Sequence, residues 1–222
     1  MTTKILIVES NPIIAFGLQK LLESESDIRV RISQDVSMQV LDVIGEFSPN
    51  IIISDIVTDN ENSMGIDFIK QVKALYAEIR FLVFSFADEN IYAERVLRAK
   101  ASGFVSKREN CEKIRWAIRC VINGRLFISE SIEKKLVQNM YGEKITESPV
   151  DTLSDRELQI LELISRGLKP SQVAGLLNLS TKTVENYRAN IRTKLNINNA
   201  FELYQYAVEW NKNMSLRQVE SA

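Results

Sequence analysis

The sequence contains no histidine, and this absence removes several kinds of chemistry before any motif is considered. Without imidazole the chain forms no histidine-dependent catalytic triad, no histidine metal ligand and no phosphohistidine of its own. Cysteine is nearly as scarce, since Cys111 and Cys120 are the only two in 222 residues. On one predicted helix they would lie on opposite faces, roughly 13 Å apart along the axis, and could not bridge. A reducing cytosol fits this composition.

Long apolar runs are absent as well, so no segment is expected to span a membrane. The apolar run Lys4–Val8 is too short for a secretory signal, and we expect a cytoplasmic protein. The formal net charge is −1, so overall charge does not indicate binding to nucleic acid. With 45% hydrophobic and 26% charged residues, the chain has the composition of a globular protein with room for one large or two small domains.

Residues 1–125 alternate short apolar runs with segments of helical spacing. The expected strands are Lys4–Val8, Ile28–Ile32, Ile51–Ser54, Phe81–Ser85 and Phe104–Ser106. The expected helices between and after them are Ile13–Leu22, Ser37–Phe47, Met64–Tyr76, Ile91–Ala99 and Glu112–Ile122. Five such units in alternation predict an α/β fold with a doubly wound, five-stranded parallel sheet. In such sheets functional groups collect at the carboxyl ends of the strands.

Polar side chains stand at four of these strand ends. Glu9 and Ser10 follow the first strand, Asp55 follows the third, Ser85 ends the fourth and Lys107 follows the fifth. These groups can converge on a phosphoryl group, with Asp55 as the nucleophile, Ser85 as a hydrogen-bond donor and Lys107 as the neutralising charge. A divalent metal would lie against Glu9 and Asp55. The alternative is that these residues are simply the solvated ends of strands.

The order of these side chains resembles the receiver domain of bacterial response regulators, over about Met1–Gly124. The resemblance implies an aspartyl phosphate at Asp55, a bound Mg²⁺ ion, and a switch formed by Ser85 and Phe104. It also implies that a cognate sensor histidine kinase or another phosphodonor is a partner.

Some positions depart from the pattern of that family. Ser10 stands where a second acid is usual, which removes a carboxylate from the metal shell. Phe86 stands where a small residue is usual, and its ring would crowd the approach of a phosphodonor. The loop Val57–Met64 is longer and more acidic than usual, and Asp59 or Glu61 within it would be the replacement ligand. Control by phosphorylation and a degenerate receiver that works without phosphate therefore both stay open.

Short helices with marked ends fill the C-terminal third of the sequence. Ser154 and Glu157 form a capping box at the start of the first, and Pro170 suits the first turn of the second. A three-residue turn then precedes a helix over Thr181–Leu195. Two helices joined by a tight turn, with a polar face exposed on the second, predict a helix-turn-helix.

The helix over Thr181–Leu195 has an apolar stripe of Val184, Ile191 and Leu195, which would pack on the other helices. Its opposite face is polar. This face either contacts DNA or is simply the solvated surface of a small helical bundle. If the helix enters a major groove, the expected base-contacting residues are Glu185, Asn186 and Ala189. The expected phosphate-contacting residues are Lys182, Tyr187, Arg188 and Arg192.

The segment LSDREL…ISRGL…VAGLLNLSTKTVENYR…IRTKL resembles the DNA-binding domain of the LuxR type, over about Asp151–Asn211. A further helix, from Asn198 to near Trp210, carries more apolar residues than one core face needs. Tyr204 and Val208 are therefore candidates for the interface of a homodimer, and packing against the first helix is the alternative.

The whole chain resembles a response regulator of the NarL/FixJ type. The resemblance implies a two-component, sequence-specific transcription regulator that binds double-stranded DNA, is not an enzyme, and has RNA polymerase as a further partner. Its expected organisation is a receiver domain over 1–125, a linker helix and flexible linker over 126–150, and an all-α, four-helix DNA-binding domain over 151–222. Ser129–Tyr141 would be the linker helix and Gly142–Thr152 the flexible boundary.

Two other classes of protein share parts of this pattern. A phosphatase with Asp55 as nucleophile would typically place its general acid two residues later, where this chain has Val57. A flavodoxin-like cofactor protein would need a phosphate-cradling turn after the first strand. The stretch Glu9-Ser10-Asn11-Pro12 begins with an acid and has no glycine, which disfavours the flavodoxin-like protein, as Val57 disfavours the phosphatase.

Overall fold

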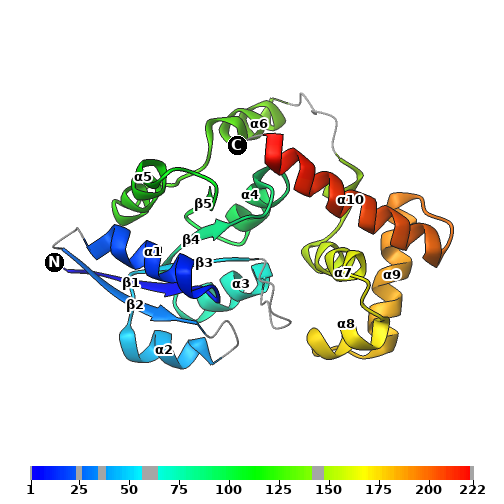
Figure 1. Cartoon of the computed structure of the whole chain (residues 1–222), viewed down its shortest axis with the longest axis horizontal. Helices are drawn as coiled ribbons and strands as arrows, with labels where there is room; N and C mark the ends of the chain where they lie inside the picture. Colours follow the sequence, from blue (N-terminus) through cyan, green and yellow to red (C-terminus); the bar gives the residue numbers. More distant parts are fainter. Residues whose placement is uncertain (1, 24–26, 35–38, 57–64, 142–147, 221–222) are drawn as a thin grey trace. The chain divides into compact units, whose positions relative to one another are not determined.

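The computed structural model of the chain describes residues 2–23, 27–34, 39–56, 65–141 and 148–220. The chain divides into two compact units, residues 1–141 and 142–222 (Figure 1). Within the described residues, no helix is both long and apolar enough to cross a bilayer.

A five-stranded parallel sheet forms the centre of the first unit, in the strand order β2-β1-β3-β4-β5. The strands are β1 (Thr3–Val8), β2 (Ile28–Ser33), β3 (Ile51–Ser54), β4 (Arg80–Ser85) and β5 (Gly103–Ser106). The three inner strands β1, β3 and β4 are almost wholly buried, as expected for a parallel sheet covered on both faces. This confirms the predicted doubly wound sheet.

Five helices follow the strands in turn. They are α1 (Pro12–Glu23), α2 (Val40–Phe47), α3 (Gly65–Leu75), α4 (Glu89–Arg98) and α5 (Cys111–Ile122). Three of them begin earlier than predicted because side chains cap them: Asn11 accepts a hydrogen bond from the Ile13 amide at 3.0 Å before α1, Asp88 accepts one from the Asn90 amide at 2.8 Å before α4, and Asn110 accepts one from the Lys113 amide at 2.9 Å before α5. Apolar residues of α1 and α5 pack together on one face of the sheet.

The segment after α5 extends the first unit in a way that the sequence did not predict. Phe127 pairs with the edge strand β5: its amide donates to the Ser102 carbonyl and its carbonyl accepts from the Phe104 amide, both at 3.0 Å. A Cβ atom on Gly103 would lie 2.3 Å from the Phe127 carbonyl oxygen, so this close pairing requires glycine. Helix α6 (Glu130–Met140) then packs against α4.

The second unit is entirely helical in its described part, which confirms the predicted class. Its elements are the 3₁₀ turn η1 (Pro149–Thr152) and the helices α7 (Asp155–Ser165), α8 (Pro170–Leu176), α9 (Thr181–Leu195) and α10 (Ala200–Glu220). The turn η1 lies within the range Gly142–Thr152 that the sequence assigns to the boundary: Val150 is fully buried there, and Asp151 caps the turn by accepting from the Ser148 amide at 3.0 Å. The prediction that the last helix ends near Trp210 was wrong. No glycine or proline interrupts the chain after Trp210, and α10 continues to Glu220.

Candidate functional site

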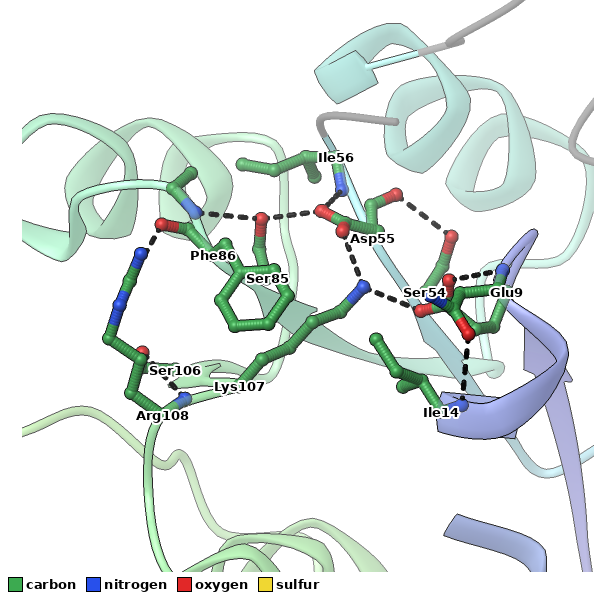
Figure 2. Close-up of polar contacts among 12 residues, drawn as sticks. Glu9, Ile14, Ser54, Asp55, Ile56, Ser85, Phe86, Ser106, Lys107 and Arg108 are labelled. Carbon is green, nitrogen blue, oxygen red and sulfur yellow. Dashed lines mark hydrogen bonds and ion pairs between the residues drawn. The ribbon is translucent and has the colours of Figure 1, made fainter. Parts of the chain in front are cut away.

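Three charged side chains meet at the carboxyl edge of the sheet (Figure 2). The Lys107 Nζ atom lies 2.6 Å from Glu9 Oε2 and 2.6 Å from Asp55 Oδ2. The exposed fractions of the three side chains are only 4% for Lys107, 4% for Glu9 and 6% for Asp55. The structure thus brings together both acids and the lysine that the sequence placed at separate strand ends, in a site shielded from water.

The register of the sheet explains why these residues converge. The strands β1 and β3 end in register, and so do β4 and β5. Glu9 and Asp55 directly follow the first pair, while Ser85 closes β4 and Lys107 follows β5. The backbone amide of Lys107 also donates to the Ser85 carbonyl at 2.9 Å, which continues the pairing of β4 and β5 past the end of the strand.

The second carboxylate oxygen of Asp55 is engaged as well. The Ser85 hydroxyl donates a hydrogen bond to Asp55 Oδ1, and the Ile56 amide donates to the same oxygen at 2.7 Å. The Ser85 oxygen in turn accepts from the Ala87 amide at 3.1 Å, so the hydroxyl is oriented by the start of the next loop. Phe104, the other residue expected in the switch, is fully buried within β5.

Phe86 lies over the cations of this edge, as Figure 2 shows. Its ring centre is 5.4 Å from Lys107 Nζ and 5.1 Å from the Arg108 guanidinium carbon, and its backbone carbonyl accepts from Arg108 Nη1 at 2.9 Å. Cations at such distances from an aromatic face are attracted to it. The sequence predicted that Phe86 lies at this site but not that Arg108 does. The position of Arg108 directly after Lys107 was the one feature that could have indicated it.

The donors available to a metal ion are few. Mg²⁺ takes oxygen ligands and is commonly held by one or two carboxylates together with water molecules and substrate phosphate. Glu9 and Asp55 meet this minimum, and Ser10 adds only a hydroxyl. No set of three or more acidic, cysteine or histidine side chains suited to a metal occurs within the described ranges. Asp59 and Glu61, the predicted replacement ligands, lie outside the described residues.

Helix α9 carries the second group of candidate residues. Val184 and Ile191 are fully buried and Leu195 is half-buried, so the predicted apolar stripe faces the interior, where α9 packs against η1, α7 and α8. Ser180 caps α9 by accepting from the Thr183 amide at 3.0 Å. Three of the candidate DNA-contacting side chains are exposed: Lys182, Glu185 and Asn186. Four are half-buried: Tyr187, Arg188, Ala189 and Arg192.

Two of the four cations on α9 are already paired. Arg188 Nη1 lies 2.9 Å from Glu185 Oε1, and Lys194 Nζ lies 2.6 Å from Glu157 Oε2. Lys182 and Arg192 have no ion pair within the described part of the chain. The positive charge that remains available to an external partner on α9 is therefore carried by these two residues.

Glu157 joins three parts of the second unit. Its buried carboxylate accepts from the Ser154 amide at 2.7 Å, as the predicted capping box requires, and from Lys194 near the end of α9. Burial opposes ionisation of this carboxyl, but the hydrogen bonds from Lys194 and Ser154 outweigh it and hold the pKa of Glu157 below its usual value. The sequence predicted the cap but not the partner on α9.

Apolar residues of α10 separate into two faces. Leu203 and Ala207 are fully buried and Met214 is buried, so this face packs in the interior, where α10 contacts α7. Phe201, Tyr204 and Val208 follow one another at helical spacing and are exposed. The surplus that the sequence showed is thus an exposed stripe and not a second part of the core.

Two sequence families match the chain. "Response regulator receiver domain" covers residues 5–119, and "Bacterial regulatory proteins, luxR family" covers residues 151–207. Among curated proteins, the Fimbriae Z protein of Escherichia coli (strain K12) is 30% identical over 205 residues, which is 92% of this chain and 96% of that protein. The response regulator GacA of Pseudomonas aeruginosa is 28% identical over 205 residues, 92% of this chain and 95% of that protein.

Solved structures share the fold. RcsB from Salmonella enterica serovar Typhimurium, bound to the promoter rprA in the presence of the phosphomimetic BeF3⁻, aligns with a TM-score of 0.71 at 22% identity. The alignment covers 94% of this chain and 99% of that chain. The resemblances that the motifs indicated, to a receiver domain and to a LuxR-type domain, are both confirmed by these matches.

Proposed function

Since the chain belongs to the bacterial response regulators that join a receiver domain to a luxR-family DNA-binding domain, we propose that phosphorylation of Asp55 controls its action as a transcription regulator. The family consists of DNA-binding transcription regulators and not of enzymes, in agreement with the sequence prediction. One observation carries the proposal: the two carboxylate oxygens of buried Asp55 are held by the Ser85 hydroxyl and the Lys107 ammonium.

The chemistry follows from those contacts. An Asp55 oxygen attacks the phosphorus of the donor, the bond from phosphorus to the leaving group breaks, and the leaving group departs with the electron pair. Lys107 offsets the charge of the new phosphoryl group, and Ser85 donates its hydroxyl to a phosphoryl oxygen. Glu9 and Asp55 would hold Mg²⁺, which when bound neutralises charge on the phosphoryl oxygens.

A receiver that acts without phosphate is the second candidate. Two observations favour it: Lys107 already satisfies both acids, and the Phe86 ring covers the Lys107 ammonium. In this mode the site is active with Lys107 bound to both acids and no phosphoryl group present. A protein partner or a second copy of the chain then regulates the protein in place of the phosphoryl group.

A mass measurement decides between the two modes. Incubation with a small phosphodonor and Mg²⁺ should add the mass of one phosphoryl group to the intact chain, and Asp55→Asn should add none. Asp67→Asn, on the exposed side of α3, is the matched control and should still be modified. If wild type gains no mass with Mg²⁺ or Mn²⁺, the phosphate-independent mode holds. Modification of Asp55→Asn would show that the acceptor lies elsewhere.

For DNA, we propose that α9 enters the major groove with its exposed face towards the bases. Asn186 can pair with adenine, Glu185 can accept from cytosine, and the Ala189 methyl can contact a thymine methyl. Lys182 and Arg192, which are free of ion pairs in the described part, hold phosphates on either side, and the half-buried Tyr187 adds a phosphate contact. The exposure of Lys182, Glu185 and Asn186 on one helix supports this placement.

Asn186→Ala should cost about 1–3 kcal/mol at one base pair and relax the preference there, because a bidentate amide contact to a base is lost. Binding-site selection with the full chain measures this directly. Asn213→Ala, an exposed asparagine of α10, should leave the selected sequence unchanged. A wild-type consensus from the Asn186→Ala protein would mean that this face of α9 does not contact bases.

We also propose that the DNA-bound form is a homodimer that uses the exposed stripe of α10. Val208→Arg should abolish cooperative binding to a two-half-site DNA while leaving binding to one half-site intact, because a charge would replace a buried apolar contact between the copies. Asn213→Arg adds the same charge away from the stripe and should bind as wild type. Cooperative binding by Val208→Arg, seen in gel-shift titrations, would place the dimer contact elsewhere.

The proposed function as a phosphorylation-controlled transcription regulator implies further partners. The chain has no histidine, so a relay through phosphohistidine must place that residue on another protein, which we propose is a cognate sensor histidine kinase. Another phosphodonor would serve the same site. Binding to promoter DNA places the regulator in the cytoplasm and makes RNA polymerase a further partner.

A further inference from the structure

The pair Glu185–Arg188 differs from an ordinary ion pair on a helix surface. Glu185 is 52% exposed, whereas the Arg188 side chain is only 18% exposed although it carries a full charge. Arg188 follows Val184 by one turn, so it leaves α9 on the side that faces the interior. Its guanidinium reaches Glu185 through Nη1 at 2.9 Å, and its Nε–H is buried without a hydrogen-bond partner.

A buried donor without a partner weakens a fold, so stability does not explain an arginine at this position. Contact with a DNA phosphate, the role expected from the sequence, does not fit the placement either. Such a contact would require the guanidinium to leave its enclosed site and to abandon the only acid on α9. Lys182 and Arg192 on the same helix have no ion pair within the described part and need no such rearrangement.

We infer that Arg188 is a positioning residue for DNA specificity, which holds the Glu185 carboxylate in a fixed place for discrimination between base pairs. The inference rests on the proposed entry of α9 into the major groove. An unpaired carboxylate would be repelled by the phosphates and free to rotate, and both effects would blur its contact with a cytosine amino group. The half-buried Arg188 guanidinium, three residues after Glu185 on α9, removes both difficulties, since it offsets the charge of the carboxylate and fixes its rotamer.

The test combines binding-site selection with salt titration on the full chain. Arg188→Gln and Glu185→Gln should reduce discrimination at one and the same base pair by roughly tenfold, and the double variant should lose no more than either single variant. The slope of log affinity against log salt should not change with Arg188→Gln. The comparator Lys182→Gln should instead lower that slope by about one and keep the consensus.

Arg188→Lys distinguishes a positioning role of Arg188 from a role of its charge alone. Because it keeps the positive charge, it is also less disruptive to the fold than Arg188→Gln. A lysine serves a phosphate well but cannot reproduce the planar guanidinium, so the variant should keep the salt slope and lose the preference. The inference is overturned if Arg188→Gln keeps the consensus and lowers the slope by about one, or if Arg188→Lys keeps the full preference. A wild-type chain that enriches no sequence at all would instead overturn the proposed DNA recognition, and this inference with it.

Discussion

Lys107→Met is expected to lower the free energy of unfolding of the first unit by about 3–5 kcal/mol. The variant removes the cation that lies between Glu9 and Asp55 and leaves two carboxylates facing each other in a site that is closed to water. Breaking a buried ion pair from one side costs more than the pair itself contributes, because the remaining charges lack both water and a partner. The serine and amide bonds to Asp55 offset only part of that cost.

Native-state hydrogen exchange of the β1 and β3 amides measures this effect within the full chain, since both strands end at the site. Lys113→Met is the matched control: Lys113 pairs with Glu109 on the surface, and its loss should cost well under 1 kcal/mol. Millimolar Mg²⁺ should restore much of the protection in Lys107→Met, because it can bind the two freed carboxylates. Unchanged protection in Lys107→Met would show that the acids tolerate each other and that the lysine is not the structural centre of this edge.

The convergence of Glu9, Asp55 and Lys107 could be predicted from the sequence, because parallel strands of one sheet end at the same edge. Their contacts could not. The bridge that Lys107 makes to both acids depends on the rotamer of a long side chain, which no local pattern specifies. The support of Phe86 by Arg108 is a contact between two loops that are far apart in the chain, so only the folded sheet brings it about.

The second unit shows the same division between local and distant information. The capping residues Ser154 and Ser180 act within one turn of chain and could be predicted from the sequence. The partial burial of Arg188 could not be predicted, because an arginine on an amphipathic helix is normally assigned to the solvent side. The length of α10 differs from the prediction for another reason: the apolar pattern ends near Trp210, but no glycine or proline follows that would end the helix.

The exposed stripe of α10 illustrates what composition can and cannot decide. The sequence of α10 contains more apolar residues than one buried face requires. Their number alone does not distinguish a second buried face from an exposed apolar surface. The structure separates them, since Leu203 and Ala207 face inwards while Tyr204 and Val208 face outwards. An apolar stripe left outside on a charged chain favours a protein partner, and closed dimers are the commonest way to cover such a surface.

Glu157→Ala is expected to lower the free energy of unfolding of the second unit by about 3 kcal/mol at neutral pH. The variant leaves Ser154 as the N-cap of α7 but removes the hydrogen bond that the Glu157 carboxylate accepts from the Ser154 amide, worth about 1 kcal/mol. It also removes a charge-assisted hydrogen bond from Lys194 to a buried carboxylate, worth about 1.5–3 kcal/mol. Lys194 is itself partly exposed and regains water when its partner is lost, which keeps the total near the lower end of the sum.

The wild-type contribution of Glu157 should depend on pH with a definite sign. Its pKa in the folded chain lies below the unfolded value of about 4.3, so the stabilisation is complete above that pH and is lost as the pH falls towards the folded pKa. Urea unfolding followed by the fluorescence of Trp210, in a Trp116→Phe background, isolates the second unit in the full chain. Wild type should lose stability from about pH 4.3 downwards, Glu157→Ala should lose less over that range, and the exposed control Glu209→Ala should follow wild type. Parallel pH profiles for wild type and Glu157→Ala would mean that the bonds from Lys194 and Ser154 do not hold the carboxylate ionised.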